Sequence, residues 1–225
     1  MTTENAAAAL AMSLGMDDEA FEKAVMGRHY DFIEIGTSDF GALIQTAGPE
    51  KRGLSVEPLK EYLDRLPNKP GVTKVNAAVS WHSGEMTIFH IPDDVRRAHG
   101  LPSWVKGTNK VGAPHPTVVR LLTERGLPLS LIKETTVPVL SVEELFEDYH
   151  IASVDFLKVD TEGHDCIILS SYLDLVDSWP QFAAKRICFE ANSLTPKADR
   201  DAVAARLRSM GYKVSKLGSD MWATR

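Results

Sequence analysis

The sequence has few cysteines and no long apolar segment. Cys166 and Cys188 are the only thiols among 225 residues, and both lie in apolar stretches. Two such residues do not form a disulfide framework, and they are typical of small buried side chains in a reducing compartment. No apolar run approaches the roughly 20 residues that a membrane-spanning helix needs. We therefore expect a cytoplasmic protein that does not interact with membranes.

Basic patches, targeting signals and repeats are also lacking. The chain has 25 Lys and Arg against 31 Asp and Glu, a formal net charge of -6. With no basic stripe, nucleic acid is not expected as a partner. The Ala-rich segment 6–12 lacks a preceding basic region and is followed by Asp17, Asp18 and Glu19, which argues against a signal peptide. No repeat or linker splits the chain.

What remains is an ordinary globular composition, with 44% hydrophobic and 25% charged residues. This length and composition suit one α/β domain with a substantial core. Residues 1–28 are predicted to form a helical leader, with a helix over 18–26. The leader is expected to pack on the sheet or on a second subunit, which would make the protein a homo-oligomer. Residues 29–225 form the main domain.

The most informative stretch runs from Val154 to Asp165. An apolar run typical of a buried parallel strand ends abruptly at Asp160-Thr161-Glu162-Gly163-His164, and helical spacing then resumes. Open α/β sheets bind their ligands at such an edge, so Asp160 and Glu162 are predicted to lie in a ligand crevice. The alternative is that these acids only cap the following helix.

A glycine turn follows the first predicted strand at 30–35. It reads Gly36-Thr37-Ser38-Asp39-Phe40-Gly41 and leads into a helix at 42–47. Strand, glycine turn and helix form a nucleotide-binding arrangement, because glycines let the backbone approach a ligand closely. Ser38 stands where a dinucleotide fingerprint has its middle glycine. A tight strand-to-helix connection without a ligand is the alternative.

Two further strands end in polar residues. Glu57 is the last residue of the second predicted strand, at 53–57, and lies about 20 residues beyond the glycine turn. An acid at this position accepts hydrogen bonds from ribose hydroxyls. A solvated helix cap is the alternative for Glu57. Asn76 lies inside the third strand, at 72–80. A buried amide needs hydrogen-bond partners, which either an adenine edge or the backbone would supply.

The segment 92–116 is rich in proline and glycine and shows no regular pattern. Irregular loops of this length in compact domains are commonly lids or binding loops. We expect a substrate lid that carries Trp104, Lys106, Asn109 and His115, and a plain surface loop is the alternative.

The rest of the chain alternates between helices and strands. Ser141 and Glu144 have the spacing of a capping box, which predicts a helix start. The expected helices are 58–66, 117–125, 142–150, 164–177 and 196–210, the expected strands are 129–140, 154–159 and 185–192, and a hairpin closes the chain at 212–224.

Three segments resemble the FkbM family of class I S-adenosylmethionine-dependent methyltransferases. They are 155–165 (Asp-Phe-Leu-Lys-Val-Asp-Thr-Glu-Gly-His-Asp), 76–80 and 141–145, and the resemblance covers roughly 31–211. It implies an α/β fold, Rossmann-like and doubly wound, with a mostly parallel seven-stranded sheet, a C-terminal antiparallel hairpin and a single domain. It also implies S-adenosylmethionine as cofactor and O-methylation of a small-molecule or sugar hydroxyl.

The same resemblance implies roles for individual residues. The predicted cofactor-binding residues are Glu34, Gly36, Ser38 and Gly41 near the methionine part, Glu57 at the ribose, Asn76 and Ala77 at the adenine, and Asp160 at the amino-acid end beside the acceptor. The sequence departs from the family in having Gly36-Thr37-Ser38 where Gly-x-Gly or Gly-x-x-Gly is commoner.

A hydroxyl acceptor must lose its proton during methyl transfer. Asp160, Glu162 and His164 are the predicted catalytic residues, and a histidine has a suitable unperturbed pKa near 6.5. His82 and His115 are further candidates in loops. No metal is expected; the alternative is Mg²⁺ or Ca²⁺ held by Asp160, Glu190 and Asn192.

Two other functions use the same features. An NAD-type dehydrogenase also needs the glycine turn and Glu57, but it leaves the turn at 160–163 without a role, and Ser38 would crowd a pyrophosphate. A non-catalytic Rossmann-like binding module would keep the fold and bind no cofactor.

Overall fold

The computed structural model describes residues 27–225. Almost all of the predicted leader, including the helix at 18–26, lies outside the described residues. Within 27–225, no helix combines the length and the apolar character needed to cross a bilayer.

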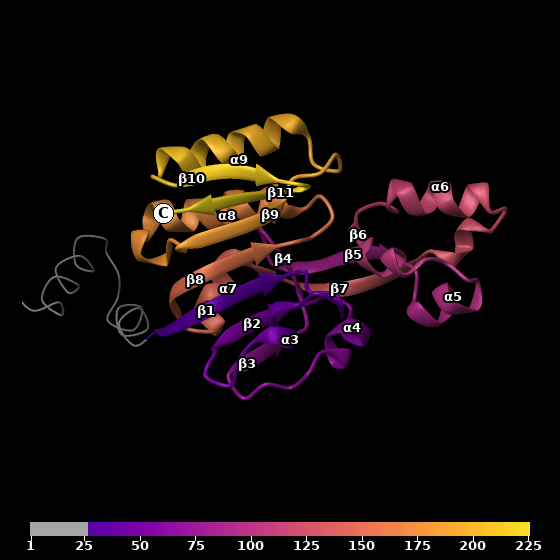
Figure 1. The fold of residues 1–225 in the computed structure, drawn as a ribbon, viewed down its shortest axis with the longest axis horizontal. Coiled ribbons are helices and arrows are strands. Elements are labelled where there is room, and N and C mark those ends of the chain that lie inside the picture. The colour runs from indigo at the N-terminus through magenta and orange to yellow at the C-terminus, as the bar shows by residue number, and fades with distance from the viewer. Residues whose placement is uncertain (1–26) are drawn as a thin grey trace, which may run out of the picture.

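A seven-stranded sheet forms the centre of the molecule, in the order β10-β11-β9-β8-β1-β2-β3 (Figure 1). β3, β2, β1, β8 and β9 are parallel, and β11 and β10 form an antiparallel pair, with β11 antiparallel to β9. The strand bounds are β1 Arg28–Ile35, β2 Gly53–Val56, β3 Val72–Val75, β8 Ile151–Val159, β9 Arg186–Glu190, β10 Lys213–Leu217 and β11 Asp220–Thr224. The mostly parallel seven-stranded sheet and its C-terminal hairpin are thus confirmed.

The order of the strands reverses between β1 and β8. From β1 the chain builds outward through β2 and β3, and it then returns to place β8 on the other side of β1. The carboxyl ends of β1 and β8 therefore lie next to each other, which is where open sheets of this kind leave a crevice.

Both faces of β1 carry core residues. Ile33 belongs to the main core, together with Leu145 of α7 (Val142–Asp148), Leu169 of α8 (Asp165–Ser178) and Leu207 of α9 (Lys197–Ser209). On the other face, Phe32 packs with residues of α3 (Leu43–Thr46) and α4 (Lys60–Arg65). Neighbouring residues of a strand point to opposite faces, so α7 to α9 and α3 and α4 cover opposite sides of the sheet.

A second sheet, in the order β4-β7-β5-β6, was not predicted. Its strands are β4 Ala78–Ser80, β5 Gly84–His90, β6 Lys110–Val111 and β7 Lys133–Ser141. The single strand predicted at 72–80 is wrong, because the chain leaves the first sheet after Val75 and pairs again with β7. The strand predicted at 129–140 starts later, since Leu129–Leu131 form a 3-10 turn.

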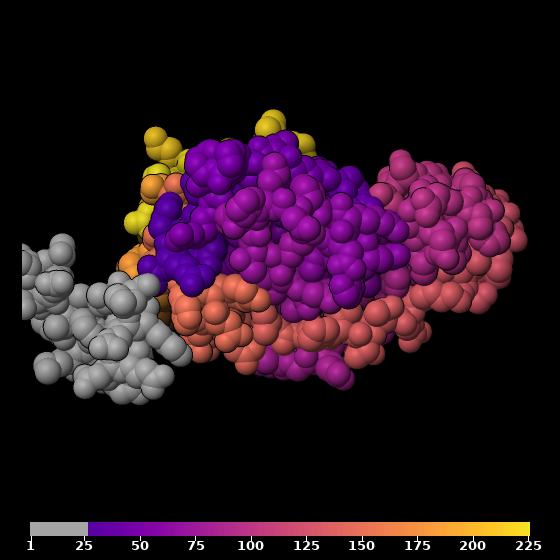
Figure 2. All heavy atoms as spheres, turned by 90° about the horizontal axis from the view of Figure 1, so that it is seen from below, coloured from indigo at the N-terminus to yellow at the C-terminus, as the bar shows by residue number. Residues whose placement is uncertain are grey.

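The prediction that 92–116 contains no regular secondary structure is also wrong. The segment contains α5 (Asp93–Ala98), a 3-10 helix at Ser103–Gly107 and β6, and α6 (Pro116–Glu124) follows. Pro92 and Pro102 precede these helices instead of breaking them, as their fixed φ allows. A small core of Ile91, Leu101, Val105, Val118 and Leu122 holds the segment together. Figures 1 and 2 show it as a lobe at one end of the molecule.

The predicted capping box is confirmed at α7. The Ser141 side chain accepts a hydrogen bond from Glu144 N at 3.0 Å, and the Glu144 carboxylate accepts one from Ser141 N at 3.3 Å. This reciprocal pair satisfies two backbone donors at the helix start and fixes where β7 ends.

Candidate functional site

A pocket of about 260 Å³ lies at the carboxyl edge of the seven-stranded sheet. Every parallel strand contributes to the lining at or just beyond its end, including Gly36 after β1, Glu57 after β2, Ala77 after β3, Asp160 after β8 and Glu190 on β9. Of the other residues predicted for the site, Ser38, Asn109, Glu162 and His164 also line the pocket.

Gly36 and Asp160 are in close backbone contact at this edge. Gly36 has φ +83°, and a Cβ at this position would lie 1.9 Å from the Asp160 backbone oxygen. Asp160 N donates to the Ile35 oxygen at 2.9 Å. The first glycine of the turn is therefore required both by its left-handed backbone and by the neighbouring chain.

Glu57 is a buried acceptor at the rim of the pocket. Its Oε2 accepts from Ser38 N at 2.7 Å and its Oε1 from Leu59 N at 2.9 Å, and the residue is 4% exposed. Burial raises the pKa of this carboxyl to about 7, although both backbone hydrogen bonds oppose the shift. A carboxylate has about four acceptor positions, so capacity remains for two ligand hydroxyls.

Glu34 lies beneath the pocket instead of lining it. Its carboxylate is fully buried, accepting from Lys158 Nζ at 2.8 Å and from Leu43 N at 2.7 Å. Burial raises the pKa of Glu34, and Lys158 partly offsets this. Lys158 in turn lines the pocket, with its Nζ 3.7 Å from Asp160 Oδ2. Glu34 thus orients Lys158, and its direct contact with a cofactor stays a prediction.

Gly41 and Asn76 do not line the pocket. Asn76 is exposed, which corrects the expectation of a buried amide, and its Nδ2 donates to the backbone oxygens of Glu57 at 3.0 Å and Pro58 at 2.9 Å. The amide therefore joins the ends of β2 and β3 through backbone partners. Gly41 has φ +67°, and a Cβ added there would meet no atom within 4 Å, so this glycine serves the bend into α3.

Glu162 has a strained backbone at the mouth of the pocket. Its φ is +52°, a region that non-glycine residues seldom occupy, and Gly163 follows at +96°. Such conformations persist where the surrounding structure holds them, often at functional sites. Glu162 Oε2 lies 3.4 Å from Nε2 of His115, whose Nδ1 accepts from Thr117 N at 3.1 Å.

Asp160 and His164 face the pocket in a partly desolvated environment. Burial raises the pKa of Asp160, and Glu162 and Asp220 add to the shift while Lys158 opposes it. His164 Nε2 lies 2.9 Å from Ser80 Oγ. Burial, with smaller contributions from Lys110 and His82, lowers the pKa of His164, which favours the neutral ring, the form that can accept a proton.

The predicted lid contacts the site through part of its length. Asn109 lines the pocket, and Lys106 Nζ lies 2.5 Å from Asp39 Oδ1 in the glycine turn. His115 reaches Glu162, as described above, but does not line the pocket. Trp104 is 42% exposed and also lies outside the pocket lining.

The residues of the alternative metal site are only partly together. Glu190 lines the pocket with Asp160. Asn192 does not line it: the Asn192 side chain lies beside Glu190, where its hydrogen bonding partly offsets the rise that burial causes in the pKa of Glu190, and its Oδ1 accepts from Leu194 N at 2.8 Å. Among residues 27–225, the group of three acids or histidines with ligand atoms within 4.8 Å is His29, Asp31 and Asp155. These residues lie toward the amino ends of β1 and β8, away from the pocket.

Lys158 and Asp39 belong to the site but were not predicted from the sequence. Lys158 stands two residues before Asp160 in the central strand, where alternation places both side chains on one face. Asp39 lies in the glycine turn, with Arg65 Nη1 at 3.0 Å from its Oδ2. In both cases the available signal was a charged residue within or next to a polar turn at the end of a strand.

Comparison with protein families identifies the chain. Residues 27–214 match the family model described as the methyltransferase FkbM domain. The chain belongs to the FkbM methyltransferase family. No curated protein matches the chain. The FkbM match spans the whole second sheet and every pocket residue named above, so the pocket is part of the methyltransferase domain itself.

Proposed function

We propose that this FkbM-family protein is an S-adenosylmethionine-dependent O-methyltransferase acting on a hydroxyl of a small molecule or sugar. The main support for this proposal is that Gly36, Glu57 and Asp160, from the ends of three separate strands, line one pocket. We assign the fold to the Rossmann-like, doubly wound class, because the strand order reverses at that edge.

The pocket residues fit the proposed cofactor by their chemistry. Glu57 offers buried acceptor positions for the two ribose hydroxyls, and the Ser38 hydroxyl is buried beside it without a hydrogen-bond partner in the described part of the chain. Ala77, Pro58 and Ile88 supply an apolar wall for the adenine. Asp160 provides a carboxylate for the amino group at the other end.

When bound, S-adenosylmethionine supplies an activated methyl group on a sulfonium sulfur. The chain must then align the acceptor oxygen with that methyl and receive its proton. Orientation alone can supply about 7–11 kcal/mol of the barrier in favourable cases. Asp160, Glu162 and His164 all face the space where the acceptor would lie. A positioned base adds about 10²–10⁴-fold, and neutral His164 is suited to that role.

The dehydrogenase alternative is less consistent with the geometry. Ser38 has φ +49° and lines the pocket, where a pyrophosphate would need close backbone approach. A dehydrogenase also gives no role to the strained turn at Glu162 and Gly163. Membership of the FkbM family supports methyl transfer over a hydride-transfer or non-catalytic function.

A direct assay tests the proposal. The full-length protein is incubated with S-adenosylmethionine and a panel of hydroxylated acceptors, and release of S-adenosylhomocysteine is measured with and without each acceptor. We expect acceptor-dependent release with at least one polyhydroxylated compound. Methyl transfer to nitrogen or carbon acceptors with none to oxygen would contradict the proposed reaction.

A further inference from the structure

Two acids lie directly opposite each other where β9 meets β11. Glu190 is paired with Asp220 in the antiparallel register, so both side chains project from the same face. Like charges directly opposite each other destabilise a sheet. No ion pair to either residue occurs among residues 27–225. The structure thus places two carboxyls together without a protein cation to neutralise them.

More acids converge on the same place. Glu190 lines the pocket with Asp160 and Glu162, and burial together with these neighbouring charges raises the pKa of Glu190 to about 8. Lys158 is the cation that lines this part of the pocket, and its Nζ is held by Glu34 at 2.8 Å. The acceptor end of the pocket therefore concentrates carboxyl groups, which favours the binding of cations and disfavours anionic molecules.

The same region offers acceptor atoms that lack donors. Glu190 Oε2 and Asn109 Oδ1 are both buried and have no hydrogen-bond partner in the described part of the chain. The Asn109 amide nitrogen is already used, donating to the Lys106 oxygen at 2.8 Å. Buried acceptors are costly when unpaired, so a molecule bound here must bring hydrogen-bond donors.

A metal ion fits this arrangement less well than an ammonium group. Octahedral Mg²⁺ with bonds of about 2.1 Å brings adjacent ligand oxygens to about 3 Å and opposite ones to about 4.2 Å. Within residues 27–225, the three acids or histidines whose ligand atoms lie within 4.8 Å of one another are His29, Asp31 and Asp155, which are not in the pocket. The acids of the pocket are therefore spaced more widely than Mg²⁺ requires. Hydrogen bonds of about 2.8 Å from an ammonium tolerate wider oxygen spacing.

We propose that the acceptor is an amino-bearing polyhydroxylated molecule, such as an amino sugar, whose protonated amine is held by Glu190. Asn109 accepts a further hydrogen bond from the same molecule, and Asp220 strengthens the negative field behind Glu190. This proposal rests on the proposed function, since it concerns the acceptor end of the methyltransferase pocket.

Binding of matched sugars tests it. D-glucosamine, D-glucose and D-glucuronate are titrated calorimetrically into full-length protein saturated with S-adenosylhomocysteine. We expect glucosamine to bind about tenfold or more tighter than glucose, because the bound ammonium stabilises the ionised form of Glu190 and pairs with it, and glucuronate to bind most weakly. Equal affinities for glucosamine and glucose, or no binding of glucosamine, would overturn the proposal.

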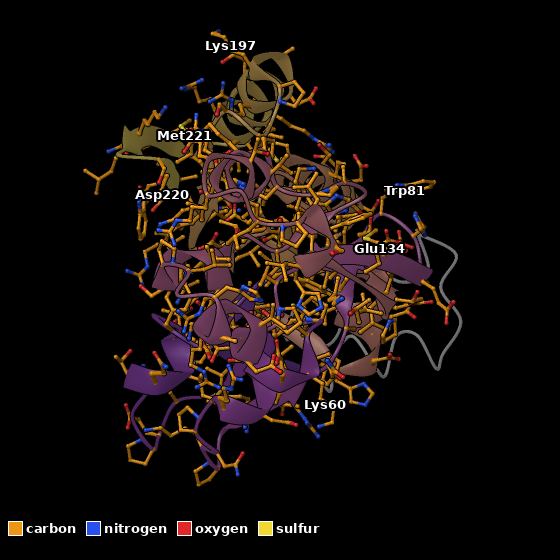
Figure 3. All side chains as sticks on the ribbon, turned by 90° about the vertical axis from the view of Figure 1, so that its right-hand side faces the viewer. Lys60, Trp81, Glu134, Lys197, Asp220 and Met221 are labelled. Carbon is orange, nitrogen blue, oxygen red and sulfur yellow. The ribbon has the colours of Figure 1, made fainter. Side chains whose placement is uncertain are left out.

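Glu190→Gln removes the charge and keeps the shape of the side chain. In this variant the preference for glucosamine over glucose should disappear, while affinity for S-adenosylhomocysteine stays within about twofold. Glu134→Gln is the matched control, because Glu134 is exposed on β7, far from Asp220 in Figure 3. It should keep the full preference. An unchanged preference in Glu190→Gln would contradict the role of Glu190.

Asp220→Asn provides a second test should Glu190→Gln fold poorly. Asp220 lies on β11 at the edge of the molecule seen in Figure 3, and the change should reduce the preference for glucosamine without abolishing it. Failure of this proposal and of the proposed function are distinguishable. Protein that binds S-adenosylhomocysteine but shows no amine preference contradicts only the acceptor class, whereas protein that does not bind it contradicts the function.

Discussion

Gly36 and Asp160 join the two central strands at the edge of the pocket: the backbone oxygen of Asp160 lies only 1.9 Å from where the Cβ of any other residue at position 36 would be. The glycine turn and the acidic turn are about 120 residues apart in sequence, yet each fixes the position of the other. The pocket therefore depends on this contact as much as on the side chains that line it.

The first prediction concerns that glycine. Gly36→Ala should destabilise the protein by about 1–3 kcal/mol or more and weaken cofactor binding, since it adds backbone strain and a clash with a neighbouring strand. Gly41→Ala is the control, because its φ is also positive, at +67°, but a Cβ there meets nothing within 4 Å. Thermal unfolding of both variants measures the difference; equal loss would show that the Asp160 contact is unimportant.

The second prediction concerns the ribose. Glu57→Ala should weaken binding of S-adenosylhomocysteine by about 1.5–3 kcal/mol, the range for hydrogen bonds to a charged group. Exposed Glu50 provides the control for removing a glutamate. Calorimetry on both variants, with circular dichroism to check the fold, tests the assignment. Unchanged affinity in Glu57→Ala would remove this residue from the cofactor site.

The third prediction concerns the acid after β8. Asp160→Asn should leave the fold intact, because the side chain keeps its size and is partly exposed. We expect turnover to fall by about 10²–10⁴-fold, because we propose that the residue lies between the cofactor and the acceptor. Steady-state assays with melting curves separate activity from stability. Near-normal turnover in Asp160→Asn would exclude a catalytic role for Asp160.

The fourth prediction is a loss of stability with rising pH. Burial raises the pKa of Glu57 and Asp165 to about 7 and of Glu190 to about 8. The folded state then binds more protons than the unfolded state above about pH 4, so the stability from these groups is present at low pH and is lost as pH rises toward 8. Each lost kcal/mol lowers Tm by about 2–4 °C in a chain of this size.

Melting curves across that range test the sign. Glu190→Gln should flatten the upper part of the fall, between about pH 7 and 9, because it removes the group with the highest pKa of the three. A Tm that rises with pH over this interval, or the same slope in the variant, would contradict the assignment of these buried acids.

Helices and strands were predicted well from the sequence where residues close together in the chain determine the structure by themselves. Ser141 and Glu144 satisfy each other's backbone groups, so the helix start needs no distant information. The apolar run ending at Asp160 likewise identified the central strand and the end of it that lines the pocket. Glu57, placed by its spacing from the glycine turn, does line the pocket.

Features that depend on distant partners were not predictable in this way. The run 72–80 contains no glycine or proline and reads as one strand, but its second half pairs with β7, about 60 residues away in sequence. Asn76 looked like a buried amide, yet it is exposed; of its two predicted kinds of partner, the backbone supplies both, through the oxygens of Glu57 and Pro58. The prolines at 92 and 102 looked like breakers, although the core around Leu101 and Val105 makes them helix starts.

The most direct test of the account is a calorimetric titration of the full-length protein with S-adenosylmethionine and, separately, with NADH. We expect micromolar binding of S-adenosylmethionine in the pocket formed by Gly36, Glu57 and Asp160, and no binding of NADH. Binding of NADH without binding of S-adenosylmethionine would contradict it.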